Sequence, residues 1–130
     1  EIYTLSLHDA LPISIHDFLA QRVAAAEAAG ISRDRIVVDP GFGFGKTTEH
    51  NLQLLRSLRE VAAPGVALMA GLSRKAMLGK ITGREVGERV HASVAAALVA
   101  VRNGAHIVRV HDVAATRDAL AVWNAVKSQN

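Results

Sequence analysis

Charged and polar side chains follow three apolar segments of the sequence, at the point where each segment ends. Asp39 follows the first segment, Ser73 and Lys75 follow the second, and Arg109 and His111 lie at the end of the third. In parallel α/β folds the carboxyl ends of the strands meet at one edge of the sheet, and ligands bind there. Three such clusters in register predict a ligand-binding site built from these residues.

A glycine-rich loop, residues 41–46, directly follows the first apolar segment and invites a nucleotide-binding interpretation. The P-loop pattern G-x-x-x-x-G-K-[ST] fits at Gly45-Lys46-Thr47, but Pro40 stands where the first glycine is required. Proline lacks both the amide and the open backbone angles that a phosphate cradle needs. Lys46 also replaces the third glycine of a G-x-G-x-x-G pattern, so we predict a tight loop and no nucleotide cradle.

Each of these residues also has a purely structural interpretation. Asp39 and Ser73 belong to the residue types that cap helices, and a lysine such as Lys75 is most often a solvated helix residue. His106 differs in strand parity from Arg109 and is expected to be structural. The remaining histidines show no metal-ligand spacing: His8, His16, His50 and His91.

The elements that must position these residues alternate helix and strand without long linkers, which is the βα pattern. We expect strands at 35–39, 66–70 and 105–110. The first helix is expected to begin at a Ser14 cap and end at Gly30, a short turn is expected to hold Met77 and Leu78, and a helix is expected from about 85 to 102. The other two helices are expected to carry apolar stripes, one made of Leu54, Leu55, Leu58 and Val61, and the other, capped by Asp112, made of Ala119, Val122, Trp123 and Val126. The strand ends recur at close to the ~31 residues per unit of a (β/α)₈ barrel, and three units cannot close one.

Three strings of residues carry a family resemblance. DPGFGFGK (39–46), GLSRKAMLG (71–79) and RVHDV (109–113) resemble the C-terminal signature segments of dihydropteroate synthases, in the same order and at the same spacing. The resemblance runs from about Ile15 to the end. It implies an α/β fold, the C-terminal three of the eight βα units of a TIM barrel. Methyltetrahydrofolate-dependent methyltransferases share the barrel and an acidic pterin contact but lack the SRK and RVHD strings, so they remain the alternative within the superfamily.

The resemblance implies condensation of 6-hydroxymethyl-7,8-dihydropterin pyrophosphate with p-aminobenzoate to dihydropteroate and pyrophosphate. Asp39 matches the carboxylate that accepts hydrogen bonds from the pterin, Lys75 matches the lysine that donates to the pterin ring, and Phe44 resembles the aromatic residue against p-aminobenzoate. Gly71 belongs to the same substrate-binding set. If Ser73 caps a turn beginning at Arg74, its hydroxyl and the helix amides offer a seat for the p-aminobenzoate carboxylate.

Arg109 and His111 stand at i and i+2, so we expect both side chains on one face of one strand. The resemblance implies that this arginine lies over the pterin and holds pyrophosphate together with the histidine. With Lys75 they form the expected catalytic set, and no protein nucleophile is expected. The family also implies Mg²⁺ bound with the pyrophosphate, whose asparagine ligand belongs to the first five strands, no metal ligand in this chain, and a homodimeric parent.

Composition is consistent with one globular domain. The chain has 130 residues, of which 50% are hydrophobic and 4% aromatic. The absence of cysteine excludes disulfides and thiol nucleophiles. The 15 basic residues are interspersed with 12 acidic ones, which disfavours nucleic acid as a partner, and no apolar stretch is long enough to span a bilayer. We therefore expect a cytoplasmic protein.

Residues 1–14 lack strand alternation and contain an X-Pro break at Pro12. Their sequence is also the translation of a common sequencing adapter, so we expect a non-native leader at 1–14 and a partial pterin-binding domain at 15–130.

An alternative from another functional class is a non-catalytic oligomerisation module. It rests on a small-residue face of the long helix: Ser93, Ala96, Ala97 and Ala100.

Overall fold

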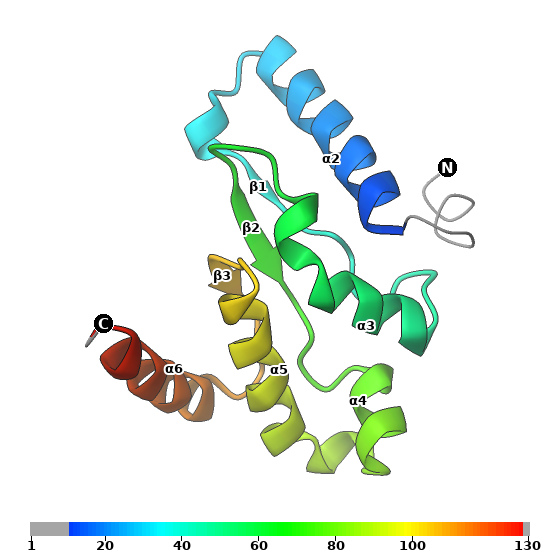
Figure 1. Cartoon of the computed structure of the whole chain (residues 1–130), viewed down its shortest axis with the longest axis vertical. Coiled ribbons are helices and arrows are strands. Elements are labelled where there is room, and N and C mark those ends of the chain that lie inside the picture. The colour runs from blue at the N-terminus through cyan, green and yellow to red at the C-terminus, as the bar shows by residue number, and fades with distance from the viewer. Residues whose placement is uncertain (1–10, 129–130) are drawn as a thin grey trace.

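The computed structural model describes residues 11–128, in which helices follow short parallel strands (Figure 1). The helices are α2 (Leu11–Ala28), α3 (Thr48–Arg56), α4 (Ala76–Thr82), α5 (Val90–Arg102) and α6 (Val113–Lys127), with short 3₁₀ turns η1 (Arg33–Arg35), η2 (Leu58–Val61) and η3 (Val86–Glu88). The strands are β1 (Val37–Val38), β2 (Ala67–Ala70) and β3 (Ile107–Val108).

The three described strands form one parallel sheet in the order β1-β2-β3. Val37 lies opposite Ala67, and Met69 lies opposite Ile107. Each strand is followed by helix, with α3 crossing from β1 to β2, α4 and α5 crossing from β2 to β3, and α6 closing the series. The predicted α/β class with three βα units is therefore confirmed, and it brings the carboxyl ends of the strands to one edge.

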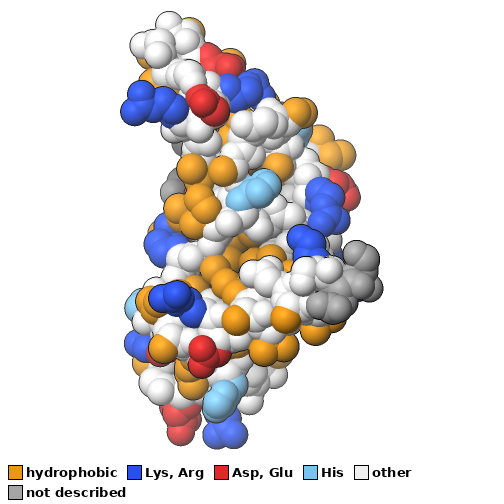
Figure 2. Space-filling view, turned by 90° about the vertical axis from the view of Figure 1, so that its left-hand side faces the viewer, with side chains coloured by type: hydrophobic (Ala, Val, Ile, Leu, Met, Phe, Trp, Pro, Cys, Tyr) orange, Lys and Arg blue, Asp and Glu red, His pale blue; other side chains and the backbone are white. Residues whose placement is uncertain are grey.

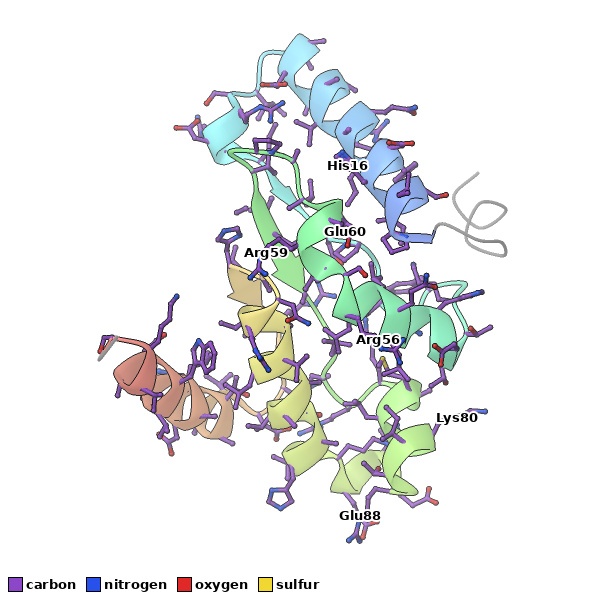
Figure 3. All side chains as sticks on the ribbon, viewed as in Figure 1. His16, Arg56, Arg59, Glu60, Lys80 and Glu88 are labelled. Carbon is purple, nitrogen blue, oxygen red and sulfur yellow. The ribbon has the colours of Figure 1, made fainter. Side chains whose placement is uncertain are left out.

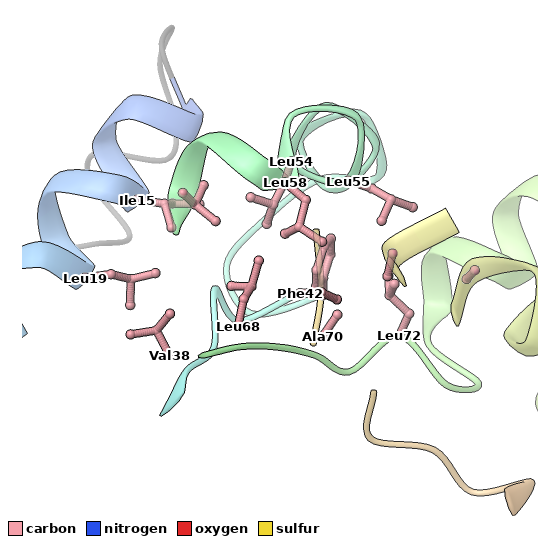
Figure 4. Close-up of a cluster of buried hydrophobic side chains, with 14 of the residues drawn as sticks. Ile15, Leu19, Val38, Phe42, Leu54, Leu55, Leu58, Leu68, Ala70 and Leu72 are labelled. Carbon is pink, nitrogen blue, oxygen red and sulfur yellow. The ribbon is translucent and has the colours of Figure 1, made fainter. Parts of the chain in front are cut away.

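One face of the sheet packs against the helices and forms the core (Figure 4). Val38, Leu68 and Ala70 point to this side, where Leu19 of α2 and Leu54 of α3 meet them. Full burial of a valine or leucine side chain contributes about 1.5–3 kcal/mol to folding. Because strand side chains alternate, the residues between them must point to the opposite face.

That opposite face carries no described helix. Val37 is 46% exposed and Ile107 is 39% exposed, and Ala67 and Met69 are only half-buried between them. Figure 2, which looks from the left-hand side of Figure 1, shows hydrophobic side chains gathered across the middle of the molecule. Beyond the strand ends, the same alternation assigns three further residues to this bare face: Asp39, Gly71 and Arg109.

The start of the first helix corrects the sequence prediction. Helix α2 begins at Leu11, so Ser14 lies inside it and does not cap it. Pro12 occupies the first turn, where its missing amide would have no helical partner, so the X-Pro step begins a helix instead of breaking one. Residues 1–10 of the leader predicted at 1–14 lie outside the described residues.

Two further helix boundaries differ from the prediction. The helix expected to reach Val61 ends at Arg56, and a 3₁₀ turn follows from Leu58, because Ser57 leaves helical geometry with ψ at 26°. The helix expected from about residue 85 begins at Val90, after a 3₁₀ turn that contains Gly87. Serine and glycine favour helix poorly, which explains both breaks.

The structure leaves one predicted apolar helix face partly exposed and buries another. On α6, Val122 and Val126 are 66% and 60% exposed, so that half of the predicted stripe does not pack within the described chain. On α5 the small-residue face is buried within this chain: Ser93, Ala96, Ala97 and Ala100. Packing inside the molecule accounts for this face, which contradicts its use as an oligomerisation surface.

Candidate functional site

The carboxyl ends of the three strands bring Asp39, Gly71 and Arg109 together. Nη1 of Arg109 lies 3.2 Å from Oδ2 of Asp39, and the guanidinium passes directly over Gly71. A Cβ at Gly71 would lie 2.6 Å from Nη2 of Arg109, so the absence of a side chain is what lets the guanidinium take this position. Gly41 also donates its amide to Oδ1 of Asp39 at 2.8 Å.

Ser73 and His111 form the second contact between strand ends. The ring nitrogen Nδ1 of His111 lies 2.8 Å from Oγ of Ser73, and the amide of His111 donates to the same oxygen at 3.2 Å. The capping role predicted for Ser73 is therefore wrong, because α4 begins only at Ala76 and has Lys75 at its N-cap position without a side-chain cap. The hydroxyl instead connects the loop after β2 to the loop after β3.

The predicted shared strand of Arg109 and His111 is also wrong in detail. β3 ends at Val108, and although the amide of Arg109 still donates to the carbonyl of Ala70, His111 lies in the following bend. The two side chains nevertheless line one cavity, because the bend turns the imidazole towards Ser73.

The glycine loop is held from within by its own lysine and by α3. Nζ of Lys46 donates to the carbonyl of Gly41 at 2.8 Å and to that of Phe44 at 3.2 Å. Gly43 donates its amide to Oδ1 of Asn51, which is buried on α3. The loop therefore bends around a lysine side chain, and it differs from the phosphate cradle that its sequence superficially suggests.

Lys75 lies at the centre of the site. Its Nζ donates to the carbonyl of Phe42 at 2.6 Å and lies 5.2 Å from the centre of the exposed Phe44 ring. Burial lowers the pKa of Lys75, the charge of Arg109 lowers it further, and Asp39 opposes both effects. Burial likewise lowers the pKa of Lys46, against the attraction of Asp39. An anion bound beside these cations would relieve their mutual repulsion.

Two cavities adjoin at Lys75. The larger, about 600 Å³, lies between the glycine loop and the starts of α3 and α4, with Phe44 on its wall. The smaller, about 300 Å³, has Gly71, Ser73, Arg109 and His111 in its lining. Lys75 lines both. Asp39 reaches the smaller cavity through its contact with Arg109, so the structure gathers all seven predicted site residues around two neighbouring spaces.

Sequence reasoning missed the residues that support this arrangement. The sequence indicates Lys46 only as part of a motif, and it does not predict that Asn51 and Ser93 hold the loops. Asn51 did carry a signal, since it shares the apolar helix face of Leu54 and Leu55, where a buried amide must find hydrogen-bond partners. Ser93 carried the same signal among buried alanines.

Within residues 11–128, no set of three or more histidine, aspartate or glutamate side chains is grouped as a metal would require. None of the helices described there is long and apolar enough to cross a membrane.

The similarity of this sequence to known proteins agrees with this arrangement of strand ends, glycine loop and paired cavities. A sequence model of the pterin binding enzyme family matches residues 8–111. The chain belongs to the pterin binding enzyme family.

Within that family, the similar proteins are dihydropteroate synthases. The curated enzyme of Neisseria meningitidis serogroup C is 54% identical over 111 residues, covering 84% of this chain and 39% of its own length. The enzyme of Escherichia coli K12 is 39% identical over 121 residues, which cover 93% of this chain and 43% of that enzyme. The chain thus spans about two fifths of the curated relatives that it matches.

Solved structures extend this similarity to the fold. The Xanthomonas albilineans dihydropteroate synthase with 4-aminobenzoic acid superposes with a TM-score of 0.89 at 53% identity, covering 92% of this chain and 44% of that one. The same enzyme in complex with 7,8-dihydropteroate matches equally well, with a TM-score of 0.89. The three βα units therefore match those of dihydropteroate synthase TIM barrels, which confirms the predicted fold.

Proposed function

We propose that residues 15–130 supply the C-terminal part of a dihydropteroate synthase active site. The reaction joins the amine of p-aminobenzoate to the methylene carbon of 6-hydroxymethyl-7,8-dihydropterin pyrophosphate, with cleavage of the carbon–oxygen bond and departure of pyrophosphate. The observation that carries this proposal is the pair of cavities that adjoin at Lys75. A reaction between two bound substrates needs two such neighbouring spaces.

Asp39 is the proposed anchor of the pterin. Its carboxylate is 34% exposed, and each oxygen already accepts one hydrogen bond, from Gly41 or from Arg109. A carboxylate oxygen has two acceptor positions, so both oxygens keep one for the amino-pyrimidinone edge. Hydrogen bonds to an ionised acceptor are about twice as strong as neutral ones, which suits this residue to recognising the ring.

The cations beside Asp39 are proposed to hold and activate the leaving group. Arg109 offers a planar fork for the pyrophosphate and a flat surface for the pterin, and His111 lines the same cavity. Lys75 is proposed to donate to the pterin ring, while the exposed ring of Phe44 packs against p-aminobenzoate in the larger cavity. Catalysis would then consist of orientation and electrostatic support of the departing anion.

The described residues offer no complete protein cage for Mg²⁺, because no three carboxylate or imidazole groups lie together there, and the metal would be held mainly by the pyrophosphate. The carboxylate of Asp39 is already paired with Arg109. A cytoplasmic, homodimeric parent enzyme is part of the same proposal.

A chimeric enzyme tests the proposed function. Residues 15–130 would replace the matching segment of the Xanthomonas albilineans synthase, and calorimetry would measure binding of dihydropterin pyrophosphate and of p-aminobenzoate. We expect both to bind and methyltetrahydrofolate to produce no heat. A folded chimera that bound methyltetrahydrofolate and ignored p-aminobenzoate would favour the methyltransferase alternative.

Replacing Arg109 by Lys in the chimera is expected to impair turnover although the charge is kept. An ammonium group cannot reproduce the planar fork that reaches Asp39 while lying over Gly71. We expect kcat/KM to fall by roughly 10- to 100-fold, because a 1 Å misplacement of a reacting group can cost about 100-fold. Steady-state kinetics measures this, and wild-type rates for Arg109→Lys would remove Arg109 from the site.

Replacing Gly71 by Ala is expected to reduce turnover with little loss of stability. The new Cβ would collide only with the far end of a flexible side chain, so the fold can adapt while the Arg109 guanidinium moves away from Asp39. Gly87→Ala is the matched control, because Gly87 has open space around it and an ordinary backbone angle. Equal kinetics for both variants, with equal melting temperatures, would show that the position of Arg109 is unimportant.

A further inference from the structure

Arg74 adopts a backbone conformation that residues with a side chain rarely take. Its φ is 59°, and within residues 11–128 every other positive φ belongs to a glycine. The Cβ of an L-residue crowds the backbone in this region, so a non-glycine residue stays there only when its surroundings hold it. Such residues concentrate at functional sites, which makes the contacts of Arg74 informative.

The backbone amide and carbonyl of Arg74 make hydrogen bonds to residues at and just before the start of α5. Its amide donates to Oγ of Ser93 at 2.9 Å, and Ser93 is buried. Its carbonyl accepts from Nη1 of Arg89 at 2.9 Å. The loop between β2 and α4 is thereby fastened to the first part of α5 and to the residue before it.

The side chain of Arg74 reaches in the other direction, to the loop after β3. Nη2 lies 2.9 Å from Oδ1 of Asp112, and Nε lies 3.3 Å from Oδ2, which is the two-pronged geometry of strong arginine–carboxylate pairs. The hydrogen bond from Arg74 is the main reason that the pKa of Asp112 is lowered. Asp112 stands at the N-cap position of α6 but makes no side-chain cap, so the predicted capping role is replaced by this ion pair.

The neighbours of this pair are the proposed site residues. Ser73 contacts His111, which adjoins Asp112, and Lys75 donates to the carbonyl of Phe42 in the glycine loop. Consecutive residues of one loop therefore contact the two flanking loops, and Arg74 lies between the two contacts. A shift of the Arg74–Asp112 pair would move Lys75 and His111 together.

We propose that Arg74 and Asp112 are positioning residues, whose ion pair fixes Lys75 and His111 relative to one another across two loops. The consequence for catalysis rests on the function proposed above. Neither residue lines the two cavities described for the site, so their effect passes through their neighbours.

Hydrogen–deuterium exchange of the 130-residue chain tests the positioning directly. Asp112→Asn removes the charge and leaves the backbone of residue 74 unaltered, and Arg74→Gly removes the side chain while tolerating the positive φ, so an effect shared by both variants comes from the lost ion pair. We expect faster exchange at both 72–76 and 109–113 in each variant. Glu49→Gln is the control, because it breaks an exposed pair with Arg56, which lies on α3, far from α6 (Figure 3). Unchanged exchange at either segment would overturn the proposal.

Kinetics of the same variants in the chimera tests the catalytic consequence. We expect kcat to fall by about 10- to 100-fold for each single variant. The Arg74→Gly/Asp112→Asn double variant should fall no further, because both changes remove one interaction. Additive losses, or wild-type kcat, would contradict a positioning pair. An unmodified chimera without activity would count against the proposed function, and the exchange measurement would still decide whether the pair fixes the two loops.

Discussion

The 130-residue chain, purified by itself, is expected to form no measurable dihydropteroate from its two proposed substrates. In the proposed site, three strand ends would place Asp39, Lys75, Arg109 and His111 on one side of the ligands, while the relatives named dihydropteroate synthase are more than twice as long. Holding two substrates in line can contribute roughly 7 to 11 kcal/mol to a reaction, and one wall of a site supplies little of this.

The same geometry predicts self-association of the isolated chain. β1 and β3 are both edges of the described sheet, and its bare face exposes Val37 and Ile107. Unpaired strand edges and contiguous apolar surface are common causes of association. Sedimentation should show oligomers, and the assay with both substrates and Mg²⁺ should show no product. Turnover near that of an intact synthase would show that the bare face needs no further strands.

Replacing Asp39 by Ala in the chimera is expected to abolish detectable pterin binding. Hydrogen bonds to a charged group contribute about 1.5–3 kcal/mol each, so the loss of two from the pterin edge weakens binding by at least roughly 100-fold. The folded protein also loses the contacts from Gly41 and Arg109, which should lower the free energy of unfolding by about 1–2 kcal/mol. Calorimetry and thermal unfolding measure the two effects separately.

Asp39→Asn separates recognition from loop structure. The amide oxygen can still accept the hydrogen bond from Gly41, so the glycine loop should keep its shape. The amide nitrogen would instead face the donor groups of the pterin, so binding should still be lost. Asp118→Asn, which changes an exposed carboxylate on α6, is the matched control. Unaltered affinity in the Asp39 variants would refute the proposed anchor.

The positions of the site residues in the sheet could be predicted because strand parity is a local property. Val38 is buried against the helices, so Asp39 had to continue the opposite face, and the same alternation placed Arg109 two residues after Ile107. Parallel pairing then brought the strand ends together. The lengths and apolar patterns of the three predicted strands were sufficient to predict this part of the site.

The contacts between loops could not be predicted from the sequence. Ser73 and Asp112 are both good helix caps by residue type, yet each serves a neighbouring loop. Arg74, which lies between Ser73 and the start of α4 at Ala76, has a positive φ that its residue type does not predict. Capping preferences differ by about 1 kcal/mol, which an ion pair and a buried hydroxyl contact together can outweigh.

The exposed valines of α6 show a second limit. Their helical spacing indicates an apolar face correctly, but the sequence does not say what covers it. In the described chain α6 packs through Thr116 towards α5, and Val122 and Val126 remain exposed. A periodic pattern thus identifies a surface without identifying its partner.

The rate of dihydropteroate formation by the chimera shows whether these residues form part of a dihydropteroate synthase site. With dihydropterin pyrophosphate, p-aminobenzoate and Mg²⁺, we expect a rate within about tenfold of the intact Xanthomonas albilineans enzyme, a difference of about 1.4 kcal/mol in barrier. The Asp39→Ala chimera provides the background. A chimera that unfolds cooperatively, yet makes no more dihydropteroate than this background, would contradict the account.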